Sequence, residues 1–202
     1  FSDEKIRMEE INRFPNHLIH CNGHYYWDIY ELYRNIVEGL KIVGQRKDIQ
    51  LTSIGIDTWG CDFTLLGKDG GFLRLPYAYR DTHIAGAAEK YFRHFDRDKC
   101  YEKTGIQVMD FNSLFQFYIL RQNNDSALAA ADKILFTPNA ISYLLTGNMT
   151  TEYTVATTGQ IVNARTKRFD AEIVQSVGLT EDNFGKFVYP GETIGYLTPE
   201  RS

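Results

Sequence analysis

The chain has 202 residues, 43% of them hydrophobic and 14% aromatic, and its 26 acidic and 22 basic residues give a formal net charge of −4. This length and composition can bury a sizeable core in one domain. No block of Lys and Arg provides a nucleic-acid-binding surface, and no apolar run approaches the roughly 20 residues that cross a bilayer. Three cysteines without a C-x-x-C spacing indicate reduced thiols in a cytoplasmic protein.

The first half of the chain predicts short strands around one long helix. Asn22-Gly23 is a favoured type I′ hairpin turn, and Asp28 is the expected N-cap of the helix, with Glu31 as its capping-box partner. Periodicity and turn residues predict, in order, a strand over 5–9, hairpin strands around 18–19 and 25–27, the helix as far as Gly44, and strands over 53–56, 61–66 and at 72. This order indicates an α/β fold with mixed strand directions.

The second half is predicted to be more helical. Asn112 can cap one of its helices through its side chain. The expected elements are helices over 82–95, 98–104, from 113 onward, 139–145 and 170–177, with a strand over 133–136 and a loop with short strands from 184 to 199. Gly105, Gly147 and Gly178 follow three of these helices and are expected to end them.

The sequence supports neither a zinc site nor a glycine-rich phosphate loop. His17, His20, Cys21 and His24 have zinc-ligand chemistry, but alternate residues of a strand face opposite sides and a turn intervenes before His24. Histidines exposed on a hairpin are the preferred interpretation, and we predict no metal site. The sequence also contains neither of the common glycine-rich phosphate loops, so no nucleotide-binding residue is assigned.

The stretch Asp57-Thr58-Trp59-Gly60 is the strongest candidate site. Asp57 would lie at the carboxyl end of a central strand, where open α/β sheets bind ligands. Glycine lets a ligand approach the backbone, and Trp59 offers a flat apolar wall suited to a sugar face. The alternative is that Asp57 only caps a turn, as Asp commonly does.

Polar residues beside aromatic ones recur at 79–81 and 111–112. Arg80 and Asp81 follow Tyr79, and Asn112 follows Phe111, a mixture that suits recognition of paired sugar hydroxyls. Taken singly, helix capping explains Asn112 and a surface ion pair explains Arg80 with Asp81. Their clustering after predicted strand ends favours a shared binding role.

Several longer segments carry a family resemblance. "EEINRFPNHLI", "SIGIDTWGCDFTLLGKDG", "LPYAYRDTH", "YEKTGIQVMDFNSLFQFYIL" and "TPNAISYLLTGNMTTEYTVATTGQIVN" occur in an order that resembles the N-terminal domain of the FGGY carbohydrate kinases. The resemblance extends from about residue 7 to about residue 195. Within the family, the Asp-Thr-Trp-Gly stretch resembles members that act on L-rhamnulose more than glycerol or xylulose kinases.

The resemblance implies a fold and a reaction. The expected fold is a ribonuclease-H-like, actin-like ATPase N-terminal domain, with a mixed sheet and flanking helices. In such kinases the γ-phosphoryl of ATP is transferred to a sugar hydroxyl, here the 1-hydroxyl of L-rhamnulose, with Mg²⁺ neutralising the phosphates. ATP binds between two domains, and the sugar lies mostly against the N-terminal one.

The resemblance also implies the residues that meet the sugar. Gly60 corresponds to a sugar-contacting glycine, and Asp57, Thr58, Trp59 and Cys61 surround it. Phe111 and Asn112 fall where relatives place a substrate-facing aromatic segment. No catalytic, cofactor-binding or metal-binding residue is assigned within the chain.

Two family motifs are not found in the sequence. The Asp-x-Gly-x-x-[ST] phosphate loop on the first strand and the His-Asp-Thr motif with the catalytic base are both absent. Residues 1–202 are therefore expected to form an incomplete sugar-binding domain that lacks its first strand. Its expected partners are the sugar and a C-terminal nucleotide-binding domain, with ATP and Mg²⁺ held mostly outside this chain.

Two other functions fit the same residues. A non-catalytic sugar-binding or sensor module could share the fold. A ribonuclease-H-type metal nuclease could use Asp57, Asp62 and Asp81, although the acidic balance argues against nucleic acid as a partner.

Overall fold

The structure, a computed structural model, describes residues 6–198. Its described strands form four two-stranded pairs: β1 with β2, β3 with β4 and β6 with β7 are antiparallel, whereas β5 and β8 are parallel. The strands are β1 (Leu18–Cys21), β2 (His24–Trp27), β3 (Phe63–Leu66), β4 (Lys133–Phe136), β5 (Thr150–Glu152), β6 (Val162–Asn163), β7 (Arg168–Phe169) and β8 (Lys186–Val188). Mixed strand directions agree with the predicted α/β class.

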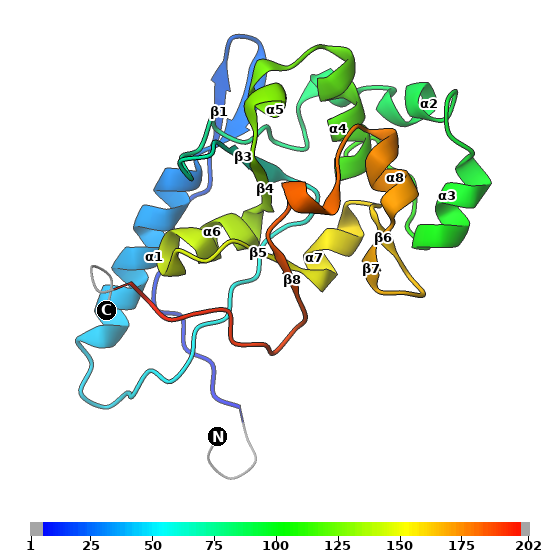
Figure 1. The fold of residues 1–202 in the computed structure, drawn as a ribbon. Coiled ribbons are helices and arrows are strands. Elements are labelled where there is room, and N and C mark those ends of the chain that lie inside the picture. Colours follow the sequence, from blue (N-terminus) through cyan, green and yellow to red (C-terminus); the bar gives the residue numbers. More distant parts are fainter. Residues whose placement is uncertain (1–5, 199–202) are drawn as a thin grey trace.

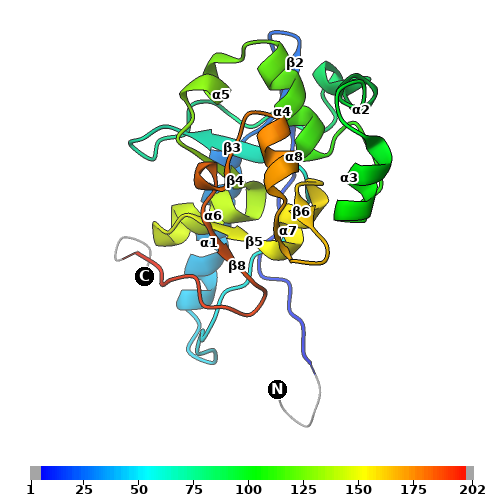
Figure 2. The same ribbon diagram turned by 45° about the vertical axis from the view of Figure 1, so that its right-hand side comes forward.

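Helices surround the central β3–β4 pair (Figures 1 and 2). They are α1 (Ile29–Gly44), α2 (Ala87–Tyr91), α3 (Arg97–Thr104), α4 (Ser113–Gln122), α5 (Ser126–Ala130), α6 (Thr137–Thr146), α7 (Tyr153–Thr158) and α8 (Ala171–Ser176), with 3₁₀ turns η1 (Thr82–Ile84) and η2 (Glu181–Asn183). In Figure 1, α1 and α6 lie on one side of the pair, and α3 and α8 lie on the other.

The β3–β4 pair separates two hydrophobic clusters. Leu65 and Ile134 pack into the larger cluster with α4 and α8, whereas Leu66 and Leu135 pack into the smaller one with α1 and α6. Successive side chains of a strand point to opposite faces, so this strand pair can serve both clusters at once. All four residues of β3 are buried, the polar Thr64 among them, because both faces of the strand pair are covered.

Local signals in the sequence predicted many element ends correctly. Asn22 and Gly23 have the positive φ angles, 51° and 80°, of a type I′ turn between β1 and β2. Asp28 caps α1 by accepting a hydrogen bond from the Glu31 N–H at 2.9 Å. Glu31 does not complete the predicted capping box, because its carboxylate binds Arg34 and Asn35 instead.

Three helices end at or near the glycines that the sequence predicted. Gly105, Gly147 and Gly178 follow α3, α6 and α8, all with positive φ.

Three predicted elements are wrong. Residues 6–9 form no strand, and Lys5 lies outside the described residues. The predicted central strand over 53–56 is an extended, mostly exposed segment, because no described strand lies beside it to accept its backbone hydrogen bonds. Residues 51–56, α6 and residues 194–197 line a groove of about 210 Å³. The predicted helix over 82–95 is interrupted between η1 and α2 by Gly86, whose φ is 69°.

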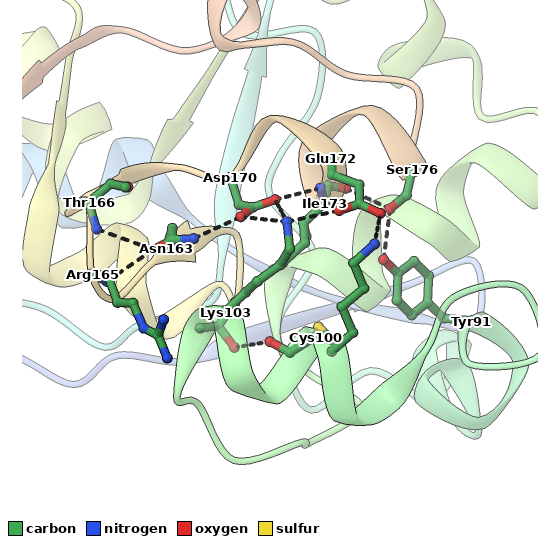
Figure 3. Close-up of polar contacts among 12 residues, drawn as sticks. Tyr91, Cys100, Lys103, Asn163, Arg165, Thr166, Asp170, Glu172, Ile173 and Ser176 are labelled. Carbon is green, nitrogen blue, oxygen red and sulfur yellow. Dashed lines mark hydrogen bonds and ion pairs between the residues drawn. The ribbon is translucent and has the colours of Figure 1, made fainter.

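A polar network joins α3 to the segment that leads into α8 (Figure 3). The Lys103 ammonium lies 2.9 and 3.0 Å from the two Asp170 carboxylate oxygens and 2.9 Å from Glu172. Asn163 also donates to Asp170, and the Tyr91 hydroxyl lies 2.7 Å from the Ser176 hydroxyl. These hydrogen bonds and ion pairs join α3, β6 and α8 to one another, so these polar side chains have partners within the protein.

Asp62, immediately before β3, is a fully buried ionisable residue. One of its carboxylate oxygens accepts hydrogen bonds from the indole N–H groups of Trp27 and Trp59, at 2.6 and 2.9 Å, and from the Tyr79 backbone N–H at 3.1 Å. The other oxygen lies 3.3 Å from the Gln116 amide nitrogen. Burial outweighs these hydrogen bonds and raises the pKa of Asp62 to about 6.

The raised pKa predicts an unusual pH dependence of stability. Between the unfolded pKa of about 3.9 and the folded value of about 6, the folded chain holds a proton at Asp62 that the unfolded chain has released. Raising the pH through this window should therefore lower the free energy of unfolding, by about 3 kcal/mol in total.

The measurement is urea unfolding at pH 4 to 7 for the parent and for Asp62→Asn. The stability of the parent relative to Asp62→Asn should fall as pH rises through the window. Asp57→Asn is the matched control, because it removes one carboxylate from the exposed side of the same turn. A stability difference that stays constant with pH would show that Asp62 is ionised throughout the window in the folded chain.

Candidate functional site

The candidate turn lies between the extended segment and β3, and its burial increases along the chain. Asp57 is exposed, Thr58, Trp59 and Gly60 are half-buried, and Cys61 is buried. The predicted position of Asp57 at the end of a central strand is wrong, since residues 53–56 directly before it form no strand. The backbone around Gly60 nevertheless reaches the surface beside an indole, as a sugar-facing turn requires.

Two helices hold the Gly60–Cys61 backbone in place. The Cys61 N–H donates to the Thr158 hydroxyl at 3.0 Å, and its carbonyl accepts a hydrogen bond from the Ser113 hydroxyl at 2.5 Å. Cys61 has a φ of 72°, a conformation that costs energy in a residue other than glycine and needs such support. Burial raises the pKa of the Cys61 thiol to about 11, so the thiol is neutral and is no nucleophile.

Gly60 has a packing reason to be glycine. A Cβ atom at this position would lie 2.5 Å from the Thr158 hydroxyl oxygen and 2.8 Å from the Thr158 Cβ. Close packing against α7 therefore requires glycine here, whether or not a ligand also approaches the backbone. Any substitution test of a binding role at Gly60 must account for this contact.

Three half-buried aromatic residues flank the turn; we refer to Trp59, Tyr79 and Phe111 as the aromatic wall. The Tyr79 and Phe111 rings meet edge to face, with centroids 5.7 Å apart. Trp27 supports the wall from inside, with its ring centroid 4.3 Å from that of Trp59. Half-exposed aromatic faces beside polar backbone are suited to the apolar faces and hydroxyls of a sugar.

Asn112 is buried beside this wall, at the N-cap position of α4. Its side chain makes none of the predicted capping hydrogen bonds. Its amide nitrogen instead donates to the Gln107 carbonyl at 2.9 Å and to the Gln160 side chain at 2.8 Å. Its oxygen lies 3.8 Å from the Cys61 sulfur. Both amide hydrogens are used inside the protein, which favours a positioning role over direct contact with a ligand.

Arg80 and Asp81 do not form the surface ion pair that the sequence allowed. Arg80 is exposed and donates to the Tyr79 hydroxyl at 3.1 Å, which leaves its guanidinium at the edge of the aromatic wall. Asp81 is buried and faces His24 and His83. Burial alone raises the pKa of Asp81, but the hydrogen bonds it accepts, first among them those of the His83 and Tyr25 N–H groups, lower it to about 2.

The carboxylates of the nuclease alternative do not gather. Asp57 is exposed, Asp62 lies under two indoles, and Asp81 faces imidazoles. In residues 6–198, the one group of side chains arranged to hold a metal ion is His24, Asp81 and His83. His17, His20 and Cys21 are exposed on the hairpin, as the sequence predicted.

Thr158, Ser113 and Gln116 hold the turn, and sequence reasoning missed all three. Gln116 donates to the Cys61 carbonyl at 3.3 Å as well as reaching Asp62. Thr158 is 97 residues from Cys61 along the chain, so no local pattern links them. The aromatic wall with its backbone turn can bind and orient a small polar molecule, and it contains no activated nucleophile or exposed general base other than Asp57.

Across the described residues, no helix combines the length and apolar character needed to span a membrane.

Comparisons with known proteins agree with this geometry. Residues 3–202 match the FGGY family of carbohydrate kinases, N-terminal domain. Rhamnulokinase of Bacteroides thetaiotaomicron is 62% identical over 99% of this chain, and rhamnulokinase of Halalkalibacterium halodurans is 37% identical over 98% of it. The chain spans 41% and 42% of the length of these two relatives.

Solved structures share the fold at low sequence identity. Gluconate kinase from Lactobacillus acidophilus superimposes with a TM-score of 0.84 at 19% identity, over 92% of this chain and 38% of that one. Plasmodium falciparum glycerol kinase with ADP gives a TM-score of 0.79 at 18% identity, over 93% and 40%. These likenesses confirm the predicted actin-like ATPase fold class. The chain therefore belongs to the FGGY family of carbohydrate kinases, as an N-terminal domain of that family.

Proposed function

We propose that this chain is the sugar-binding part of a cytoplasmic kinase that transfers the γ-phosphoryl group of ATP to the 1-hydroxyl of L-rhamnulose. In that reaction the bond between the γ-phosphorus and the bridging oxygen of ATP breaks, and ADP leaves. A new bond forms to the sugar oxygen, whose proton passes to a base. The proposal assigns this base to a part of the longer protein outside residues 1–202.

The observation that carries the proposal is the aromatic wall beside the backbone of Gly60. Trp59 offers an indole face, and the neighbouring backbone is held rigidly by Thr158 and Ser113. Rigid placement favours binding, because less conformational freedom is lost when the sugar is ordered. The names of the similar rhamnulokinases support L-rhamnulose as the sugar. Asp57 and Thr58 are proposed to contact its hydroxyls.

The described residues do not fit Mg²⁺ with ATP. Mg²⁺ prefers oxygen ligands, whereas the one cation-capable group in residues 6–198 has two imidazoles and a single carboxylate. The sequence likewise has no phosphate loop. We therefore propose that the nucleotide and its metal are held by the remainder of the longer protein, and that this remainder is the main partner of the chain.

The chain alone should not turn over ATP. Purified residues 1–202 are expected to release ADP at the background rate with L-rhamnulose and Mg²⁺ present, because the residues proposed to bind nucleotide lie outside them. The full-length protein should phosphorylate L-rhamnulose in preference to L-fuculose, D-xylulose or glycerol. A coupled assay for ADP measures both.

Each failure of that assay has a separate meaning. Turnover by the isolated chain would contradict the proposed division of labour. A full-length protein that binds L-rhamnulose without phosphorylating it would support the non-catalytic sensor module instead. Preference for another sugar would agree with a kinase activity but contradict L-rhamnulose as its substrate.

Substitution at Gly60 tests the contact with sugar. Gly60→Ala in the full-length protein should raise the KM for L-rhamnulose at least tenfold, a loss of about 1.4 kcal/mol, because the methyl group stands between sugar and backbone. The control for packing is Gly60→Ala combined with Thr158→Gly, which removes the atoms that the new Cβ would strike.

Thr158→Gly alone reports the cost of losing the hydrogen bond to Cys61. A sugar contact predicts that the double variant keeps a KM well above that of Thr158→Gly. If adding Gly60→Ala to Thr158→Gly leaves the KM unchanged, the glycine serves packing only. Gly60→Val should exceed Gly60→Ala in its effect on KM, and an unchanged KM would make the turn purely architectural.

A further inference from the structure

Three metal-ligating atoms converge where the β1–β2 hairpin meets η1. One ligand atom from each of His24, Asp81 and His83 lies within 4.8 Å of the other two. Asp81 Oδ1 is 3.1 Å from the His24 nitrogen and 2.6 Å from the His83 nitrogen. This cluster shares no residue with the turn at 57–61 or with the aromatic wall, and the proposed kinase function does not use it.

The carboxylate of Asp81 keeps its position without the imidazoles. Its Oδ2 accepts a hydrogen bond from the Tyr25 N–H at 2.5 Å, and its Oδ1 accepts one from the His83 N–H at 2.9 Å. The side chain is wholly buried. The carboxylate would therefore remain aimed at the two rings if both imidazole nitrogens turned to another partner.

Aromatic contacts hold the two imidazoles in position. The Tyr77 ring centroid lies 4.4 Å from that of His83 and 5.1 Å from that of His24. His83 is almost buried, whereas the His24 side chain is 36% exposed, so His24 provides both an approach from solvent and the freedom to adjust. Asp81 and His83 are thus held in place, whereas His24 can adjust its position.

Two imidazole nitrogens and one carboxylate oxygen form a ligand set for borderline divalent transition ions, with zinc the best match. In a tetrahedral zinc site with bonds of about 2.0–2.1 Å, ligand atoms are about 3.3–3.4 Å apart. The observed contacts would have to lengthen by less than 1 Å, which a small rotation of His24 and His83 supplies. Water would occupy the fourth position.

We propose that His24, Asp81 and His83 bind one Zn²⁺ ion, which fastens the β1–β2 hairpin to the segment that follows Tyr79 and Arg80. The ion would replace the contacts that now join the two imidazole nitrogens to Asp81 Oδ1. His83 Nε2 has no hydrogen-bond partner, whereas the second nitrogen of a zinc-bound histidine is normally held by an acceptor. That missing support is expected to weaken Zn²⁺ binding by about 10- to 100-fold relative to a site whose histidines are both supported.

Binding of Zn²⁺ alone to the chelator-stripped chain provides the test, by competition with a chromophoric chelator. One Zn²⁺ per chain is expected, and His24→Ala, His83→Ala and Asp81→Asn should each weaken binding at least tenfold. His20→Ala and Cys21→Ser are the matched controls, since both residues are exposed on the same hairpin and have metal-binding side chains. Both controls should bind Zn²⁺ as the parent does.

A second measurement guards against variants that fail to fold. Zn²⁺ should raise the melting temperature of the parent and of His20→Ala, because an ion that binds the folded state stabilises it, but not that of the half-exposed variant His24→Ala. Loss of binding in His20→Ala or Cys21→Ser would assign the ion to the hairpin instead. Absence of stoichiometric binding, or equal binding by His24→Ala, would overturn the proposal.

Discussion

A carboxylate can be buried only when hydrogen-bond donors surround it, and the burial of Asp62 imposes that condition on four separate parts of the chain. Trp27 comes from β2, Trp59 from the candidate turn, Tyr79 from the following loop and Gln116 from α4. The Asp62 backbone carbonyl also accepts the N–H of Thr137 at the start of α6. Satisfying this one residue therefore brings Trp59 and Tyr79 of the aromatic wall together and orients the turn beside them.

In this arrangement, the residues that fix the turn in place differ from the residues that we propose bind the sugar. Buried groups do the holding: Asp62 binds the indole nitrogens, while Thr158 and Ser113 fix the Cys61 backbone. Half-buried groups, namely Trp59, Phe111 and the backbone of Gly60, are the part that we propose contacts a ligand. In the proposed kinase, this surface selects the sugar, and residues elsewhere in the longer protein carry out phosphoryl transfer.

Local signals predicted much of the fold, and long-range pairing accounts for what they missed. The Asn22–Gly23 turn, the Asp28 cap and the glycine after α3 depend on neighbouring residues, so sequence patterns locate them. A strand at 53–56 would need a partner strand, which no local pattern can supply. The run of β-branched residues from 150 to 158 has no clear period, and β5 and α7 were missed there. Likewise, Asp57 and Asp62 look equivalent in sequence, although distant residues bury only Asp62.

We propose above that the turn from Asp57 to Cys61 faces the sugar. A crystal structure of the full-length protein with L-rhamnulose bound would show whether it does. We expect the sugar within van der Waals contact of the Gly60 backbone and against the face of Trp59 or Phe111. A sugar bound with no contact to residues 57–61 would leave the turn with a structural role alone and would overturn the proposal.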